Sequence, residues 1–245
     1  MNFFGLTDTG SVRRDNQDSY AIRVPDDRMA VAVVCDGMGG AQAGNVASAV
    51  AVESFAAAAE DACREELPES DGAWERLAVA ACKKANQVVF ELSQSNPEYA
   101  GMGTTLVGAL VLPEKLFVVN VGDSRAYLIR NGEIHQITRD HSLVQLLVSR
   151  GELTAEQARV HPKKNLITRA LGVDRDVTAD CYHVTWQEGD SLLLCSDGLS
   201  NVLTDQVLLE QAVEQRPLEE RCRSMMRMTL EHGAPDNVTI VMAQR

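Results

Sequence analysis

The 245-residue sequence lacks the features that mark a secreted, membrane-spanning or disulfide-linked protein. Its six cysteines form no Cys-x-x-Cys pair, and Cys35 and Cys195 lie within apolar runs typical of buried strands. No apolar run approaches the roughly 20 residues that span a bilayer, and the chain does not open with a basic stretch followed by an apolar core. We therefore expect a cytoplasmic protein with reduced thiols and no membrane partner.

Positive charge is scarce as well. The chain carries 23 Lys and Arg residues against 35 Asp and Glu residues, which gives a formal net charge of -12. Nucleic acids and anionic membranes are bound by clustered Lys and Arg side chains. The composition therefore argues against both as partners, and bound divalent cations would offset part of the negative charge.

Two kinds of catalytic motif are missing. None of the six cysteines is followed by Arg at the Cys-x5-Arg spacing, which excludes a cysteine-based phosphatase. The five histidines show no metal-ligand spacing such as His-x-x-x-His, and four of them suit structural or surface positions. His141 is the exception, because it lies in an Asp-His-Ser stretch and is a candidate for contact with a substrate.

The organisation of the chain favours one domain over residues 1–245, since no linker, internal repeat or low-complexity segment divides it. Asn131-Gly132 predicts a two-residue hairpin. Period-two patterns predict strands at residues 1–7, 18–24, 29–35, 104–112, 115–121, 125–130, 133–138, 179–185, 191–196 and 238–242. Helical patterns fall at residues 43–63, 71–95, 142–150, 154–159, 204–214 and 218–232. Antiparallel strand groups separated by helix pairs indicate an α+β layered sandwich.

Five short acidic motifs lie far apart in the sequence. Apolar, strand-like runs directly precede three of them, so their carboxylates are expected where strands give way to turns. Carboxylates gathered in one place repel one another unless hard cations such as Mg²⁺ or Mn²⁺ neutralise them. The motifs are Arg13-Arg14-Asp15-Asn16-Gln17-Asp18, Asp36-Gly37-Met38-Gly39-Gly40, Gly122-Asp123-Ser124-Arg125, Ser196-Asp197-Gly198 and Asp236-Asn237.

Asp36-Gly37 is the strongest single candidate for a metal centre, because an apolar strand ends there and glycine lets the backbone approach a cation. The alternative is an ordinary turn at the end of a strand, which is the commoner meaning of an isolated Asp-Gly pair. That alternative must also explain Asp197-Gly198 after a second apolar run and Asp236 before the last strand. The repetition favours a metal-centred enzyme.

The chemistry that such a centre supports is hydrolysis. Two metal ions about 3.5–4 Å apart lower the pKa of a bridging water enough to give hydroxide near neutral pH. Phosphomonoester cleavage is the natural task, because charge neutralisation and in-line placement matter most there. Arg13 is the candidate for holding the phosphate, since a guanidinium group binds a phosphate dianion through two hydrogen bonds.

Taken in order, these motifs resemble those of the metal-dependent serine/threonine protein phosphatases of type 2C, the PPM family, in their compact bacterial form. The resemblance covers nearly the whole chain. Any one motif is weakly specific, whereas the ordered set is strong. Further matching stretches are Gly101-Met102-Gly103-Thr104-Thr105, Asp140-His141-Ser142 and Thr168-Arg169-Ala170-Leu171-Gly172.

The resemblance implies a central β-sandwich flanked by helix pairs and hydrolysis of phosphoserine and phosphothreonine by metal-activated water. It implies two Mn²⁺ or Mg²⁺ ions and a weaker third. The matching positions assign the bridge between both metals to Asp36, the second site to the Gly37 carbonyl, the first metal to Asp197 and Asp236, metal-bound water to Asp18, the third metal to Asp123 with Asp197, and the phosphate to Arg13. The partners implied are phosphorylated proteins and a serine/threonine kinase, with a monomer as the default state.

The resemblance also implies a flap beside the active site at about residues 141–170, with a part in substrate choice. His141, at the start of this flap, is a candidate for contact with the substrate. Two positions depart from the better-known eukaryotic pattern. Met38 replaces a histidine proposed as general acid, and Gln17 replaces a glutamate near the second metal, so we expect weak metal binding.

Several alternatives remain at this stage. Asp174-Arg175-Asp176-Val177-Thr178 fits the nucleophile pattern of haloacid-dehalogenase-type phosphatases, but the residues before it are polar rather than a buried strand. A catalytically inactive binding or regulatory module of the same fold is the second alternative, and retention of every candidate carboxylate argues against it. A phosphatase dedicated to a single regulatory partner is the third.

Overall fold

The computed structural model describes residues 1–39, 43–64 and 66–245, and two sheets form its centre. The strand pairings described are all antiparallel. One sheet has the order β1 (Asn2–Asp8), β11 (Val238–Gln244), β10 (Ser191–Cys195), β7 (Arg125–Arg130) and β8 (Glu133–Gln136). The other has the order β2 (Asp18–Asp26), β3 (Met29–Met38), β5 (Leu106–Val111), β6 (Lys115–Val121) and β9 (Asp180–Thr185), and β4 (Gly103–Thr104) pairs with β3.

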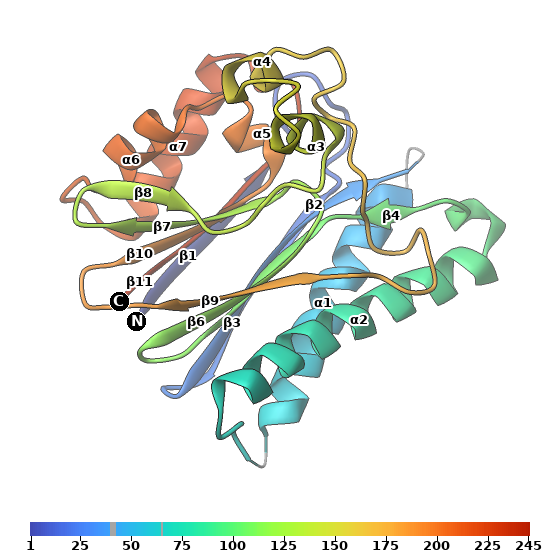
Figure 1. The fold of residues 1–245 in the computed structure, drawn as a ribbon, viewed down its shortest axis with the longest axis horizontal. Coiled ribbons are helices and arrows are strands. Elements are labelled where there is room, and N and C mark those ends of the chain that lie inside the picture. The colour runs from blue at the N-terminus through green and yellow to red at the C-terminus, as the bar shows by residue number, and fades with distance from the viewer. Residues whose placement is uncertain (40–42, 65) are drawn as a thin grey trace.

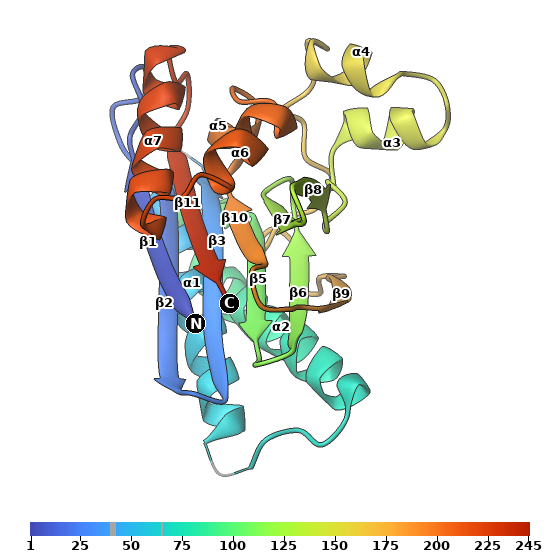
Figure 2. The same ribbon diagram turned by 90° about the vertical axis from the view of Figure 1, so that its left-hand side faces the viewer.

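The helices cover the outer faces of the two sheets (Figures 1 and 2). The long helices α1 (Ala43–Cys63) and α2 (Asp71–Ser95) lie against the sheet that contains β3, and a 3₁₀ turn (Pro97–Tyr99) follows them. On the other sheet lie α5 (Asp197–Ser200), α6 (Asp205–Ala212) and α7 (Leu218–Glu231). Two short helices, α3 (Leu143–Ser149) and α4 (Ala155–Arg159), stand beside α5 at one end of the sandwich (Figure 2).

Three buried apolar clusters hold these layers together. One joins α1 and α2 to their sheet around Phe55 and Phe117, and another joins α5–α7 to theirs around Leu199 and Met225. The third lies between the sheets, where alternate residues such as Val34 face the opposite sheet. Because successive strand residues point to opposite faces, each central strand contributes side chains to two clusters. The α+β sandwich with helices on both sides is confirmed.

Most predicted elements lie within two residues of their expected bounds. Asn131 and Gly132 both have positive φ, 52° and 76°, as the predicted two-residue hairpin between β7 and β8 requires. The single strand expected at residues 104–112 is wrong in one respect, because it divides into β4 and β5. Thr105 interrupts it, since its amide donates to the Asp36 carbonyl and its hydroxyl accepts from the Asp36 amide.

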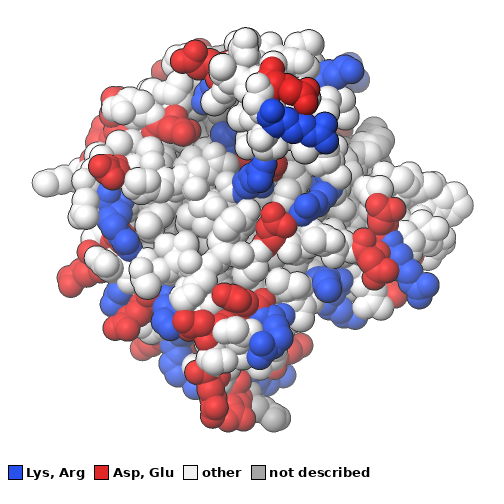
Figure 3. All heavy atoms as spheres, in the orientation of Figure 1, with Lys and Arg blue, Asp and Glu red and all other residues white. Residues whose placement is uncertain are grey.

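Acidic and basic side chains are interspersed on the face seen in Figure 3, and neither sign forms a continuous field there. In the part of the chain that the structure describes, no helix is both long and apolar enough to cross a bilayer.

Candidate metal centre

Asp18 and Asp36 meet at one end of the sandwich. Residues Met29–Cys35 of β3 are fully buried, so this strand is fixed in the core up to the point where Asp36 emerges. Asp18 begins β2 and lies directly opposite Asp36 in the register of the β2–β3 pair. Two carboxylates from different motifs are thus neighbours across adjacent strands.

The other acidic motifs reach the same end from the opposite sheet and from the turn after β6. Asp197 opens α5 just after β10, Asp236 precedes β11, and Asp123 lies between β6 and β7. A cavity of about 270 Å³ opens among them. Its lining includes Arg13, Asp36, Gly37, Asp123, Asp197 and Asp236. The structure therefore brings together residues that are more than 200 positions apart in sequence.

Burial and mutual repulsion disfavour the charged forms of these carboxyl groups. Burial raises the pKa of Asp36 well above its ordinary value, and the charges of Asp18 and Asp197 add to the effect. The pKa of Asp197 is raised to about 7, by burial first and then by the charge of Asp236. Burial likewise raises the pKa of Asp18 to about 6 and that of Asp123 well above its usual range. Such a cluster stabilises a bound cation.

The oxygen atoms themselves fit a hard divalent ion. Oδ1 of Asp18 and Oδ1 of Asp197 are buried without a hydrogen-bond partner, although an unpaired buried acceptor costs about 1–3 kcal/mol or more. Carboxylate oxygens are the ligands that Mn²⁺ and Mg²⁺ prefer. Within the described ranges, no three His, Cys, Asp or Glu side chains converge on one point. Backbone carbonyls or water must then complete a coordination sphere.

Gly37 is required by the close approach of two other segments. A Cβ atom at this position would lie 2.0 Å from the Gly44 carbonyl oxygen of α1 and 2.7 Å from the Gln17 carbonyl oxygen. The Gly37 amide donates to that same Gln17 oxygen at 3.0 Å. The glycine thus lets β3 pack between α1 and the loop before β2. Gly40, at the end of the same motif, lies outside the described residues.

Arg13 lies at the edge of the cavity. Its Nη2 donates to Asp236 Oδ2 at 2.8 Å, and its side chain is 52% exposed. The hydrogen bond to Asp236, followed by the charge of that carboxylate, raises the pKa of Arg13. Arg13 is therefore anchored to the cluster through Asp236. Its exposed side chain can still contact an anion that enters the cavity.

Comparisons with known proteins identify this arrangement. Residues 11–239 match the family model described as Protein phosphatase 2C. The chain belongs to the protein phosphatase 2C family. It is 36% identical to the serine/threonine phosphatase stp of Listeria monocytogenes over 239 residues, 98% of this chain and 94% of that relative.

Solved structures agree with this assignment. The serine/threonine phosphatase Stp1 from Staphylococcus aureus superposes with a TM-score of 0.91 at 36% identity, covering 99% of this chain and 94% of that one. The catalytic domain of serine/threonine protein phosphatase PstP in complex with two manganese ions superposes with a TM-score of 0.85 at 34% identity, covering 99% and 97%. The predicted family, fold and protein phosphatase class are confirmed.

In this phosphatase His141 is buried and is not among the residues that line the cavity. Its Nδ1 accepts from the Gly122 amide at 3.2 Å, and its Nε2 lies 3.1 Å from Asp180 Oδ2. Nε2 therefore carries the proton that Asp180 accepts. Burial lowers the pKa of His141, so the ring is neutral at physiological pH. This geometry places His141 as a support for the Gly122–Asp123 turn.

Several residues around the site carry roles that their motifs did not suggest. Asn237 holds three positions of the loop between β1 and β2, because its Oδ1 accepts from the Gln17 amide and its Nδ2 donates to the carbonyls of Thr9 and Asp15. Ser196 and Thr239 both donate to Asp18 Oδ2 at 2.7 Å. The only signal in the sequence was their position beside Asp197, Asp236 or a strand end.

The predicted flap segment leaves and re-enters the fold at one point. The His141 amide donates to the Gly122 carbonyl, the Thr168 amide donates to the His141 carbonyl, and Ser142 pairs with Ile167. Near its end, Asn165 and Ile167 line the 270 Å³ cavity. The segment that carries α3 and α4 is thus tied at its base beside the metal centre.

Proposed function

We propose that this phosphatase hydrolyses phosphoserine and phosphothreonine in proteins, and that the acidic cavity is its active site. The observation that carries the proposal is a cavity of about 270 Å³ whose lining includes Arg13 and the four carboxylates of Asp36, Asp123, Asp197 and Asp236, with Asp18 opposite Asp36 on the adjacent strand. Two Mn²⁺ or Mg²⁺ ions and a weaker third are the cofactors. When bound, these ions supply a water molecule of lowered pKa and neutralise the phosphate charge.

The ligand roles proposed here are those that the resemblance to the family implies for the matching residues. Asp36, whose charge interacts with those of Asp18, Asp123, Asp197 and Asp236, would bridge two ions. The Gly37 carbonyl would complete the second site. Asp197 and Asp236 would bind the first ion, and the unpaired Oδ1 of Asp197 is available for it. Asp18 would hold metal-bound water through its unpaired Oδ1, and Asp123 with Asp197 would hold the third ion.

Arg13 binds the phosphate. In the structure Arg13 forms an ion pair with Asp236. When a metal ion is bound, the Asp236 carboxylate would rotate toward that ion and release Arg13. The guanidinium group then has donors for two phosphate oxygens. Met38 holds no proton to donate and the proton of His141 Nε2 is committed to Asp180, so metal-bound water or a group other than these two side chains would protonate the leaving serine or threonine oxygen.

The flap over residues 141–170 takes part in substrate choice, supported by the place of Asn165 and Ile167 in the cavity wall. The cellular partners are phosphoproteins, among them a serine/threonine kinase whose action the enzyme reverses. A cytoplasmic location is supported by six unpaired cysteines, five of them buried. We assign the enzyme as a monomer.

The test is hydrolysis of p-nitrophenyl phosphate and of a phosphothreonine peptide with and without Mn²⁺, comparing wild type with Asp36→Asn and Asp197→Ala. We expect activity that requires the ion and is lost in both variants. Metal-independent activity after thorough chelation, or no activity with any divalent cation, would overturn the proposal.

A further inference from the structure

Asn86 is a buried amide on a helix face that is apolar apart from Ser93. It is 1% exposed, and its neighbours on the buried face of α2 include Cys82, Ala85 and Val89. Burying an amide costs free energy unless all of its hydrogen bonds are made. A leucine, which has the same number of side-chain heavy atoms, would suit this face without that requirement. The polar side chain therefore has a specific task.

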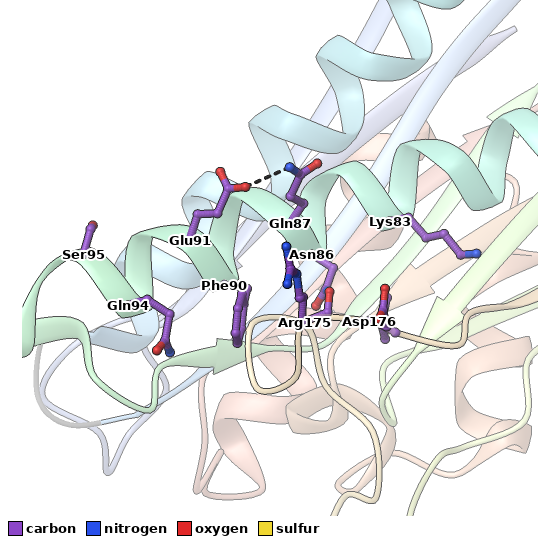
Figure 4. A pocket seen from close by; sticks show the side chains of 10 residues that line it. Lys83, Asn86, Gln87, Phe90, Glu91, Gln94, Ser95, Arg175 and Asp176 are labelled. Atoms are coloured by element: carbon purple, nitrogen blue, oxygen red, sulfur yellow. Dashed lines mark hydrogen bonds between the residues drawn. The ribbon is translucent and has the colours of Figure 1, made fainter.

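That task is to hold the loop before β9. Asn86 Nδ2 donates to the carbonyls of Asp174 and Arg175 at 3.1 and 3.0 Å, and Asn86 Oδ1 accepts from the Gly172 amide at 2.8 Å. Figure 4 shows Asn86 projecting from α2 toward the loop that bears Arg175 and Asp176. Three hydrogen bonds from one side chain thus bind three of the four residues 172–175 of this loop.

Gly172 brings the loop close enough for these bonds. Its φ is +82°, and a Cβ atom there would lie 2.4 Å from Val89 Cγ1 and 3.2 Å from the Met102 carbonyl oxygen. Only glycine fits this conformation and this contact. The loop is therefore fixed against α2 from two sides, by the amide of Asn86 and by the packing of Gly172.

The same loop is hydrogen-bonded to the strand beside Asp36. Leu171 and Thr104 form a two-bond bridge, with N to O distances of 2.8 and 3.1 Å. Thr104 Oγ1 donates to the Asp36 carbonyl at 2.9 Å, and the Thr105 amide donates to the same oxygen at 2.8 Å. The Asp36 amide in turn donates to Thr105 Oγ1 at 2.9 Å. Both main-chain polar groups of Asp36 thus depend on residues 104 and 105.

We propose that Asn86 is a positioning residue for the metal centre. By fixing residues 172–175 it holds the Leu171–Thr104 bridge, and through that bridge the backbone from which the Asp36 carboxylate projects. Loss of Asn86 loosens Asp36 and weakens binding of the ions. The identity of the ions rests on the proposed function, whereas the connection from Asn86 to Asp36 rests on the hydrogen bonds alone.

The experiment compares Asn86→Leu with wild type by two measurements. Amide hydrogen exchange in the metal-free protein is expected to become faster at Thr104, Thr105 and Asp36. Isothermal titration with Mn²⁺ is expected to show an affinity about tenfold lower, within the range found for residues that act from outside a binding site. Both are made well below the unfolding temperature of the variant, so that global unfolding does not contribute.

Three further variants separate positioning from general destabilisation. Gly172→Ala disturbs the loop with Asn86 intact and should reproduce both effects. Cys82→Ala removes a fully buried group from the same helix and should lower the unfolding temperature without changing Mn²⁺ affinity. The double variant Asn86→Leu with Thr104→Val should lose no more Mn²⁺ affinity than the more strongly affected of the two single variants. The reason is that both substitutions interrupt the same connection from Asn86 to Asp36.

Unchanged exchange at Asp36 in a folded Asn86→Leu variant would overturn the inference. So would an equal loss of Mn²⁺ affinity in Cys82→Ala, because the effect would then follow stability. A wild type that binds no Mn²⁺ contradicts the proposed function instead. In that case, faster exchange at Asp36 in Asn86→Leu still supports the connection from Asn86 to Asp36.

Discussion

At the scale of single residues, the active site is a region where function opposes stability. Asp36 is half-buried and has four other carboxylates nearby, and both burial and their charges raise its pKa in the absence of metal. A neutral side chain would be accommodated more favourably there. Retention of the charge is explained by the cation that it binds.

We expect Asn at position 36 to separate these two properties. Asp36→Asn should lower kcat by about a thousandfold, because it removes a ligand from both ions. The same change should raise the unfolding temperature in EDTA, because it removes a charge from a crowded site. Paired activity and thermal unfolding measurements check this. Equal or lower stability of the metal-free variant would contradict the electrostatic account.

Arg13 is a residue whose loss should act on binding more than on folding. Arg13→Ala removes the phosphate ligand from the rim of the cavity, so KM for a phosphothreonine peptide should rise by about tenfold. The neighbouring Arg14, which is also exposed, serves as the matched control. Steady-state kinetics of both variants decide the matter, and equal effects at the two positions would mean that general surface charge is responsible.

At the scale of secondary structure elements, some buried polar side chains link a helix to its neighbours through hydrogen bonds that the apolar pattern of the sequence does not reveal. Arg221 of α7 is 7% exposed, and its guanidinium group donates to the carbonyls of Arg216 and Ala212 and to Gln244 Oε1. It thereby closes the C-terminal end of α6 and ties α7 to β11. Charged side chains are buried only when their hydrogen bonds are made.

Replacing this group should destabilise the helical layer without altering chemistry. Arg221→Met leaves two carbonyls and an amide oxygen unpaired, so the free energy of unfolding should fall by about 2–4 kcal/mol. Arg223→Met on the same helix removes an exposed pair with Glu219 and should change stability by less than about 1 kcal/mol. Urea unfolding measures both. Similar values for the two variants would refute the structural role of Arg221.

At the scale of the whole molecule, the acidic cluster contains residues from both sheets. Its charge state therefore affects the stability of the entire fold. Asp197 illustrates the sign. Its folded pKa of about 7 exceeds the ordinary value of 3.8 for an aspartate, so the folded state binds more protons between these values. The stability of the metal-free protein therefore falls as the pH rises from about 4 to 7.

Metal ions should reverse this trend. We expect Mn²⁺ to raise the unfolding temperature more at pH 7.5 than at pH 5, because the carboxylates are charged and available as ligands at the higher pH. Thermal unfolding in EDTA and in Mn²⁺ at the two pH values is the measurement. A metal-free protein that is more stable at pH 7.5 than at pH 5 would contradict the raised pKa values.

The sequence by itself determined the elements and the set of candidate carboxylates. Apolar patterns are a local property of the sequence. The apolar run 31–35 is followed directly by Asp36, and the run 192–195 is followed by Ser196-Asp197, whatever surrounds them in the fold. The order of the motifs was enough to indicate the family. The break at Thr105 was not visible, because a threonine within an apolar run fits a continuous strand equally well.

Tertiary structure alone decided how these residues are held. The hydrogen bonds of the His141 ring, the two donors on Asp18 and the connection from Asn86 to Asp36 all depend on groups at least 19 positions apart in sequence. Such contacts follow from strand register and from the packing of helices on sheets, which no local pattern specifies. For that reason no local pattern distinguishes Asn86 from an ordinary polar residue of an amphipathic helix.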